Sequence, residues 1–123
     1  MDSKDMTLDI LGTPYQVRYS DYDATPFFKQ HSCDGYCDSN NKVIAVCNMK
    51  TYPSYEEEPD EVLRIIEKEV LRHEIIHAFL NECGLRDSSL QYAGGWAKNE
   101  EMIDFFAIQF KKLQKVFETA DAL

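Results

Sequence analysis

The chain has 123 residues, of which 44% are hydrophobic and 12% aromatic. This is enough for one compact domain with a buried core and too little for two, so we expect a single domain over residues 1–123. Thirteen Lys and Arg against 22 Asp and Glu leave a formal net charge of -9. Because such a surface repels phosphate backbones and anionic lipids, we expect neither nucleic acid nor a membrane as a partner.

The first residues, MDSKDMTLDI, contain no apolar stretch of signal-peptide length, and no apolar run in the chain reaches the length of a membrane span. A cytoplasmic location is therefore expected. Four cysteines are scattered at positions 33, 37, 47 and 83. Only Cys33 and Cys37 are close in sequence, so the spacing favours reduced, partly buried thiols over a four-thiolate zinc site.

Residues 1–50 predict β structure. The segment MTLDILGTPYQVRYS alternates apolar and polar residues on either side of Gly-Thr-Pro, which predicts a hairpin with its turn there. The next segment, TPFFKQH, is compatible with a short helical turn or a loop. In CDGYCDSNNKVIAVCN, the turn formers at residues 38–41 separate two strand-like pieces, and the second piece, residues 42–48, is rich in β-branched side chains.

A long helix is predicted from about residue 59 to residue 83. Pro59 suits a first helical turn, the acidic residues after it suit the positive end of the helix dipole, and Gly84 is a typical stop signal. Three- and four-residue steps place five residues on one face, which we expect to point toward the core: Val62, Ile66, Val70, His73 and His77.

A second helix is predicted over about residues 97–120. Its expected core stripe consists of Ile103, Phe106, Ala107, Phe110, Leu113 and Phe117. The expected fold class is therefore α+β, with a small antiparallel or mixed sheet packed on two long helices.

The predicted first helix carries the pattern H-E-x-x-H at His73-Glu74-Ile75-Ile76-His77. Helical residues four apart are separated by about 6 Å along the axis, so both imidazoles can point at one metal ion. Glu74 flanks the same point and can reach a water on that ion. The alternative is a pair of ordinary histidines on a partly buried helix.

A catalytic zinc site needs a third protein ligand, and no histidine follows His77. The segment NEEMID at residues 99–104 offers Glu100, with Asp104 one turn later, where it can orient a ligating histidine. Glu101 is adjacent to Glu100, but a helical wheel places it opposite the expected core stripe, whereas Glu100 lies on the flank of that stripe.

H-E-x-x-H followed by N-E-x-x-x-D on the next helix resembles the gluzincin metallopeptidases, the thermolysin-like group. The small size resembles their single-domain relatives, the minigluzincins and the phage-associated ImmA/IrrE-type peptidases, and the match covers residues 42–110. The resemblance implies a minimal zincin-like domain with Zn²⁺ on His73, His77 and Glu100. It also implies Glu74 as general base and acid, Asp104 as a partner of a ligating histidine, and a sheet whose edge strand lines the substrate cleft.

Larger gluzincins stabilise the transition state with a histidine from a C-terminal helical subdomain, and we expect neither that subdomain nor that histidine here. By position, Tyr92 is the best replacement, and its alternative role is a loop aromatic packed on the core. His31 is a weaker candidate, and Trp96 is expected to anchor the start of the second helix.

The expected activity is hydrolysis of a peptide or protein substrate that binds as an extended strand. Two alternatives stay open: a catalytically latent, zinc-stabilised binding module, and a regulatory protease of a phage, prophage or other mobile element with one dedicated protein target.

Overall fold

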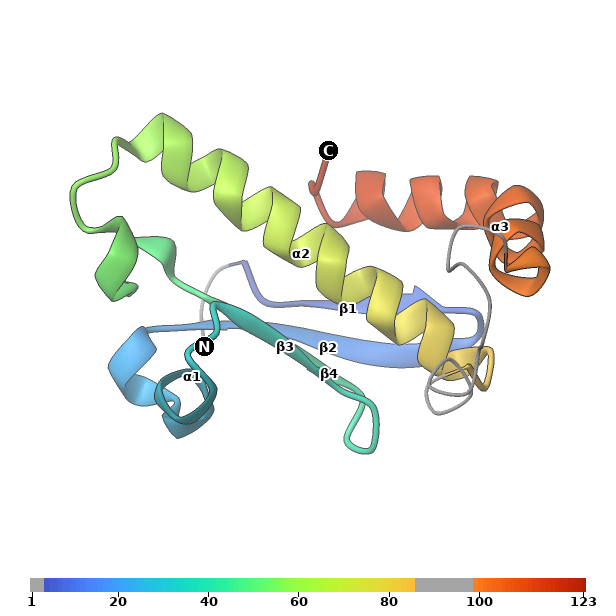
Figure 1. The fold of residues 1–123 in the computed structure, drawn as a ribbon, viewed down its shortest axis with the longest axis horizontal. Helices are drawn as coiled ribbons and strands as arrows, with labels where there is room; N and C mark the ends of the chain where they lie inside the picture. The colour runs from blue at the N-terminus through green and yellow to red at the C-terminus, as the bar shows by residue number, and fades with distance from the viewer. Residues whose placement is uncertain (1–3, 86–98) are drawn as a thin grey trace.

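The computed structural model of the chain describes residues 4–85 and 99–123 (Figure 1). The expected α+β class is confirmed, with a four-stranded sheet that is mixed. The strands and helices are β1 (Met6–Ile10), β2 (Thr13–Ser20), α1 (Pro26–His31), β3 (Gly35–Asp38), β4 (Val43–Cys47), α2 (Asp60–Glu82) and α3 (Glu100–Thr119). Short 3-10 helices cover Tyr22–Ala24, Met49–Thr51 and Pro53–Tyr55.

The predicted first hairpin is confirmed, but its turn lies earlier than expected. β1 and β2 pair antiparallel with Ile10 opposite Thr13, so the turn consists of Leu11 and Gly12. Both have positive φ, 51° and 93°, which matches the twist of a two-residue hairpin turn. Asp9 Oδ1 accepts the Gly12 N–H at 2.7 Å and closes the turn. Thr13 and Pro14, expected in the turn, are the first residues of β2.

The sheet has the strand order β1-β2-β4-β3. β4 pairs antiparallel with β3 and parallel with β2, so it lies inside the sheet, whereas β3 is an edge strand. The two strand-like pieces predicted on either side of residues 38–41 are therefore confirmed as β3 and β4, except that Asp38 belongs to β3. Asp38 still shapes the turn, because its Oδ1 accepts the N–H groups of Asn40 and Asn41.

β4 is buried on both faces, which explains its nearly continuous apolar sequence, VIAVC. Ile44 and Val46 belong to the main core, which α2 covers. Ala45 and Cys47 pack with Phe28 of α1 on the opposite face. TPFFKQH, left open between helix and loop, thus contributes α1, and α1 and α2 cover opposite faces of the sheet (Figure 1).

The predicted long helix is confirmed as α2, which ends before Gly84 with a φ of 76°. Its core-facing side differs from the expected stripe. Val70 is only half-buried and both motif histidines are exposed. The apolar side chains that α2 buries lie one position further round the helix, and they are Leu63, Leu71, Ile75, Ala78 and Phe79.

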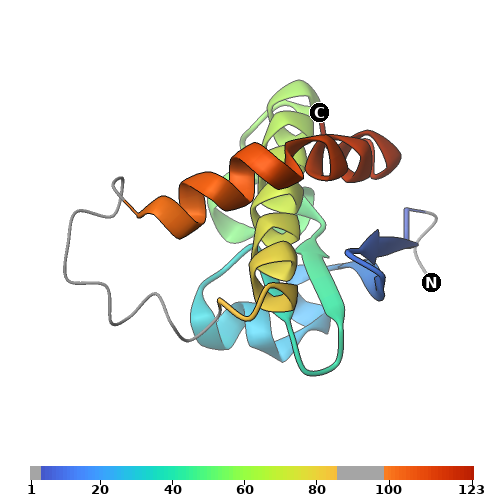
Figure 2. The ribbon, with the colours of Figure 1, turned by 90° about the vertical axis from the view of Figure 1, so that its right-hand side faces the viewer.

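α3 begins at Glu100 after Asn99, whose side chain accepts the Met102 N–H at 3.1 Å as an N-cap. The expected core stripe is partly wrong. Leu113 is buried, but Phe110 is 58% exposed, and Phe105 is buried although it lay outside the expected stripe. The reason is that α3 crosses α2 and reaches the β1 edge, so only a narrow side of it meets the core (Figure 2).

All four cysteines are free thiols. Within residues 4–85 and 99–123, no helix combines the length and the apolar character needed to cross a membrane.

Glu82, the last residue of α2, joins the end of this helix to the sheet. Its carboxylate accepts hydrogen bonds from Thr13 Oγ1 at 2.8 Å, from the Tyr15 phenol at 2.7 Å and from Lys42 Nζ at 2.8 Å. These hydrogen bonds lower the pKa of Glu82 to about 2, and the bond from Lys42 has the largest effect. The carboxylate is therefore stabilised in its charged form by three donors, two from β2 and one from the loop before β4.

We predict that Glu82→Ala lowers the free energy of unfolding by about 1–3 kcal/mol, because the buried Tyr15 phenol loses its acceptor. Since the folded-state pKa of Glu82 lies below the ordinary value of 4.5, its contribution is complete above that value and is lost as the pH falls toward about 2. Urea unfolding at several pH values should show a smaller acid dependence in Glu82→Ala. Glu118→Ala, an exposed glutamate on α3, is the matched control. Equal effects of the two substitutions would contradict the assignment.

Candidate metal centre

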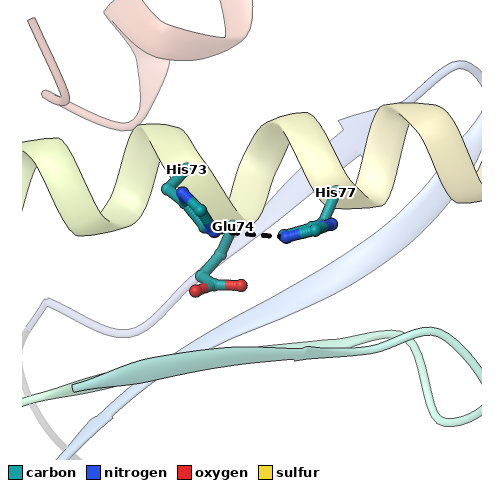
Figure 3. A group of neighbouring side chains, drawn as sticks. All are labelled: His73, Glu74 and His77. Carbon is teal, nitrogen blue, oxygen red and sulfur yellow. Dashed lines mark hydrogen bonds between the residues drawn. The ribbon is translucent and has the colours of Figure 1, made fainter. Parts of the chain in front are cut away.

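α2 brings together the three residues of the H-E-x-x-H pattern. One ligand atom from each of His73, Glu74 and His77 lies within 4.8 Å of the others. The Nε2 atoms of the two histidines are 3.2 Å apart, and their rings turn toward each other while the Glu74 carboxylate points toward the sheet (Figure 3). Two imidazole nitrogens and a carboxylate oxygen are a donor set suited to zinc. The predicted convergence of these residues is confirmed.

Glu74 is the buried charged group of this site, with 6% of its surface exposed. Burial, and secondly the negative charge of Asp34, raise the pKa of Glu74 to about 7. A carboxylate with a pKa near neutrality can both accept and return a proton. Partial burial and the neighbouring His73 ring lower the pKa of His77, which favours the neutral imidazole that binds metals.

β3 passes unusually close to α2 at Gly35. A Cβ atom at Gly35 would lie 2.6 Å from Val70 Cγ1, 3.2 Å from the Ala45 carbonyl oxygen and 3.3 Å from Glu74 Oε2. Any side chain would therefore push the strand away from the helix. The absence of a side chain at Gly35 lets the backbone of an edge strand lie directly beside the Glu74 carboxylate.

A cavity of about 780 Å³ opens beside the three motif residues. One wall is formed by α2, including Leu80 and Asn81, and the other by β3 and α1. His31, a weaker candidate in the sequence, lines this cavity. Phe27 and Tyr36 also line the cavity, and no pattern in the sequence indicated this. The glycine at residue 35, inside a predicted strand, was a signal that another backbone or side chain approaches closely there.

The structure does not bring the predicted third ligand to the histidines. Glu100, Glu101 and Asp104 are exposed in the first turns of α3. Among the described residues, the group placed to share an ion contains only residues of α2 and no cysteine. The reason is topological, because α3 contacts β1 and α2, whereas the cavity adjoins β3 at the opposite edge of the sheet. Tyr92 and Trp96 lie outside the residues that the structure describes.

Comparison with known proteins gives no match to any protein-family model, curated protein or solved structure. The resemblance to gluzincins therefore rests on the two sequence motifs alone.

We predict that Gly35→Ala weakens zinc binding, because moving β3 away from α2 alters the packing of Val70 and Glu74 beside the two histidines. It should also lower the free energy of unfolding by about 1–3 kcal/mol, because the methyl group overpacks the contact with α2. Competition titration with a zinc chelator and urea unfolding measure the two effects. Gly12→Ala is the control, since its φ is +93° but nothing lies within 4 Å of the added Cβ. It should lose stability and keep its zinc affinity.

Proposed function

We propose that this protein is a zinc-dependent peptidase of the minimal gluzincin type. The observation that carries the proposal is the convergence of His73, Glu74 and His77 within 4.8 Å, at a cavity bordered by an edge strand. The two imidazoles would hold Zn²⁺ through nitrogen atoms. When bound, the ion supplies Lewis acidity toward the scissile carbonyl and acidifies a water molecule.

Glu74 is the residue that moves protons in this proposal. Its carboxylate would take a proton from the attacking water and deliver it to the leaving amine. The support is its burial, its pKa of about 7 and its position between the histidines and β3. Glu74 also offers an oxygen that lies close enough to share an ion with the two histidines. Whether Glu74 is a proton carrier or a metal ligand is therefore tested directly below.

β3 would hold the substrate. As an edge strand beside the cavity, it offers one side of its backbone to an extended peptide, which would pair with it as an added strand. This mode of binding recognises the peptide backbone, so it suits a peptide or protein substrate and requires no nucleic acid or membrane.

Glu100 remains the proposed third ligand, with Asp104 as the residue that orients a histidine, on the sequence pattern alone. This assignment requires the start of α3 to approach α2 in the zinc-bound protein. Tyr92 remains the proposed group for stabilising the developing oxyanion. A cytoplasmic location belongs to the same proposal, and the four free thiols support it.

A catalytically latent, zinc-stabilised binding module is the second candidate. The position of Glu100 outside the metal-capable group favours it, since a two-histidine site with one flanking glutamate could bind zinc for structural purposes. A dedicated regulatory target, as in a phage or prophage protease, rests on the resemblance alone.

We predict that the wild type carries about one zinc per chain and that Glu74→Gln keeps this zinc while losing hydrolysis by about 10²–10⁴-fold, because an amide cannot accept the proton. Elemental analysis and cleavage of a fluorogenic peptide library measure the two properties. Glu61→Gln, an exposed glutamate in the first turn of α2, should change neither. Loss of zinc from Glu74→Gln would make Glu74 a ligand, and zinc without any hydrolysis by the wild type would support the latent module.

We predict that Glu100→Ala loses the metal and that Glu101→Ala keeps it. The two glutamates are adjacent and both exposed, so each serves as the matched control of the other. Paired zinc titrations decide between them. The reverse result would shift the ligand by one residue and leave Asp104 without its role, whereas no change in either variant would exclude α3 from the site.

A further inference from the structure

Three aromatic rings form one wall of the cavity and have no part in the proposed chemistry. The Phe27 ring centroid lies 4.0 Å from that of His31 and 4.2 Å from that of Tyr36. All three side chains line the same cavity as His73, Glu74 and His77. Phe27 is 38% exposed, although large apolar side chains in this fold are mostly buried. We call Phe27, His31 and Tyr36 the aromatic wall.

The aromatic wall and the metal-capable residues lie on opposite faces of β3. A side chain at Gly35 would point at Val70 and Glu74 of α2. The next residue, Tyr36, packs instead on Phe27 and Phe28 of α1. This is the two-residue alternation of a strand. The cavity therefore extends around the outer edge of β3, with the chemistry on one side and aromatic rings on the other.

The register of the β3–β4 pair shows which backbone groups face this outer edge. The Cys47 N–H donates to the Asp34 carbonyl at 2.9 Å, so these two residues form a hydrogen-bonded pair. Because such pairs alternate along an antiparallel ladder, Tyr36 also bonds toward β4, whereas Gly35 and Cys37 direct their backbone groups outward. The Gly35 N–H already interacts with the Cys33 thiol, so Cys37 is the more available partner.

A peptide strand added to β3 would therefore bond to the residues that point outward. Residues directly opposite each other on neighbouring strands have their side chains on the same face. Peptide residues opposite Gly35 and Cys37 would have side chains on the α2 face. The peptide residue between them, opposite Tyr36, would have its side chain on the α1 face, against the aromatic wall. This holds for either direction of the peptide.

We propose that the aromatic wall is a specificity subsite that selects an aromatic or large aliphatic side chain at the substrate residue opposite Tyr36, close to the scissile bond. The inference rests on the proposed peptidase function and adds the class of substrate to it. The exposed part of Phe27 provides apolar surface on which a further aromatic ring can pack. Aromatic pairs associate favourably when they are stacked with an offset or meet edge to face. The proposed hydrolysis requires no such surface, so the aromatic wall is available for recognising a substrate side chain.

The test uses a peptide that the zinc-loaded protein cleaves, with Phe or Ala placed in turn at each of the positions around the cleaved bond. We expect kcat/KM to favour Phe over Ala by about tenfold or more at one position, the size of discrimination that an apolar pocket achieves. In Phe27→Ala this preference should fall to within about twofold, while the zinc content stays unchanged. Phe110→Ala, an exposed phenylalanine of α3, is the matched control and should keep the preference.

Binding of the same fluorescein-labelled peptides to the zinc-loaded protein separates the two proposals. Hydrolysis without a preference for Phe at any position overturns the subsite and leaves the peptidase intact. Tighter binding of one Phe peptide without hydrolysis, lost in Phe27→Ala, supports the subsite and overturns the peptidase. Equal effects of Phe27→Ala and Phe110→Ala, or no preference in either assay, overturn the subsite.

Discussion

The contact between β3 and α2 at Gly35 is the constraint on which the candidate site depends. It brings the backbone of an edge strand so close to α2 that a Cβ atom at Gly35 would overlap Val70 and press on Glu74, so the contact requires a residue without a side chain. The same contact removes water from the Glu74 carboxylate and so raises its pKa. It also fixes β3 between α1 and α2, and this position gives the cavity its two unlike walls.

Local features of the sequence predicted the parts of the fold that local interactions determine. The bounds of α2 followed from Pro59, the acidic first turn and Gly84, and both hairpins followed from alternation and turn residues. The convergence of His73 and His77 was predictable for the same reason, because a four-residue step on one helix needs no tertiary information.

Features that depend on how elements pack could not be predicted in this way. α3 carries two overlapping apolar stripes, and only its crossing of α2 and β1 determines that Phe105 is buried and Phe110 is exposed. The place of β3 at the sheet edge depends on the parallel pairing of β2 with β4. The distance of Glu100 from the histidines depends on both, so spacing along the chain could not determine it.

The parallel pairing of β2 with β4 also has a consequence for the kinetics of folding. Each antiparallel pair is a hairpin closed by a short turn, and hairpins form within microseconds. Joining the two hairpins closes a longer loop that contains α1 and β3. Its larger entropic cost makes this step slower. Only in this step does the β3–β4 hairpin join β2, and only then can α1 pack on the completed sheet. The cavity is therefore expected to form late, after much of the secondary structure is present.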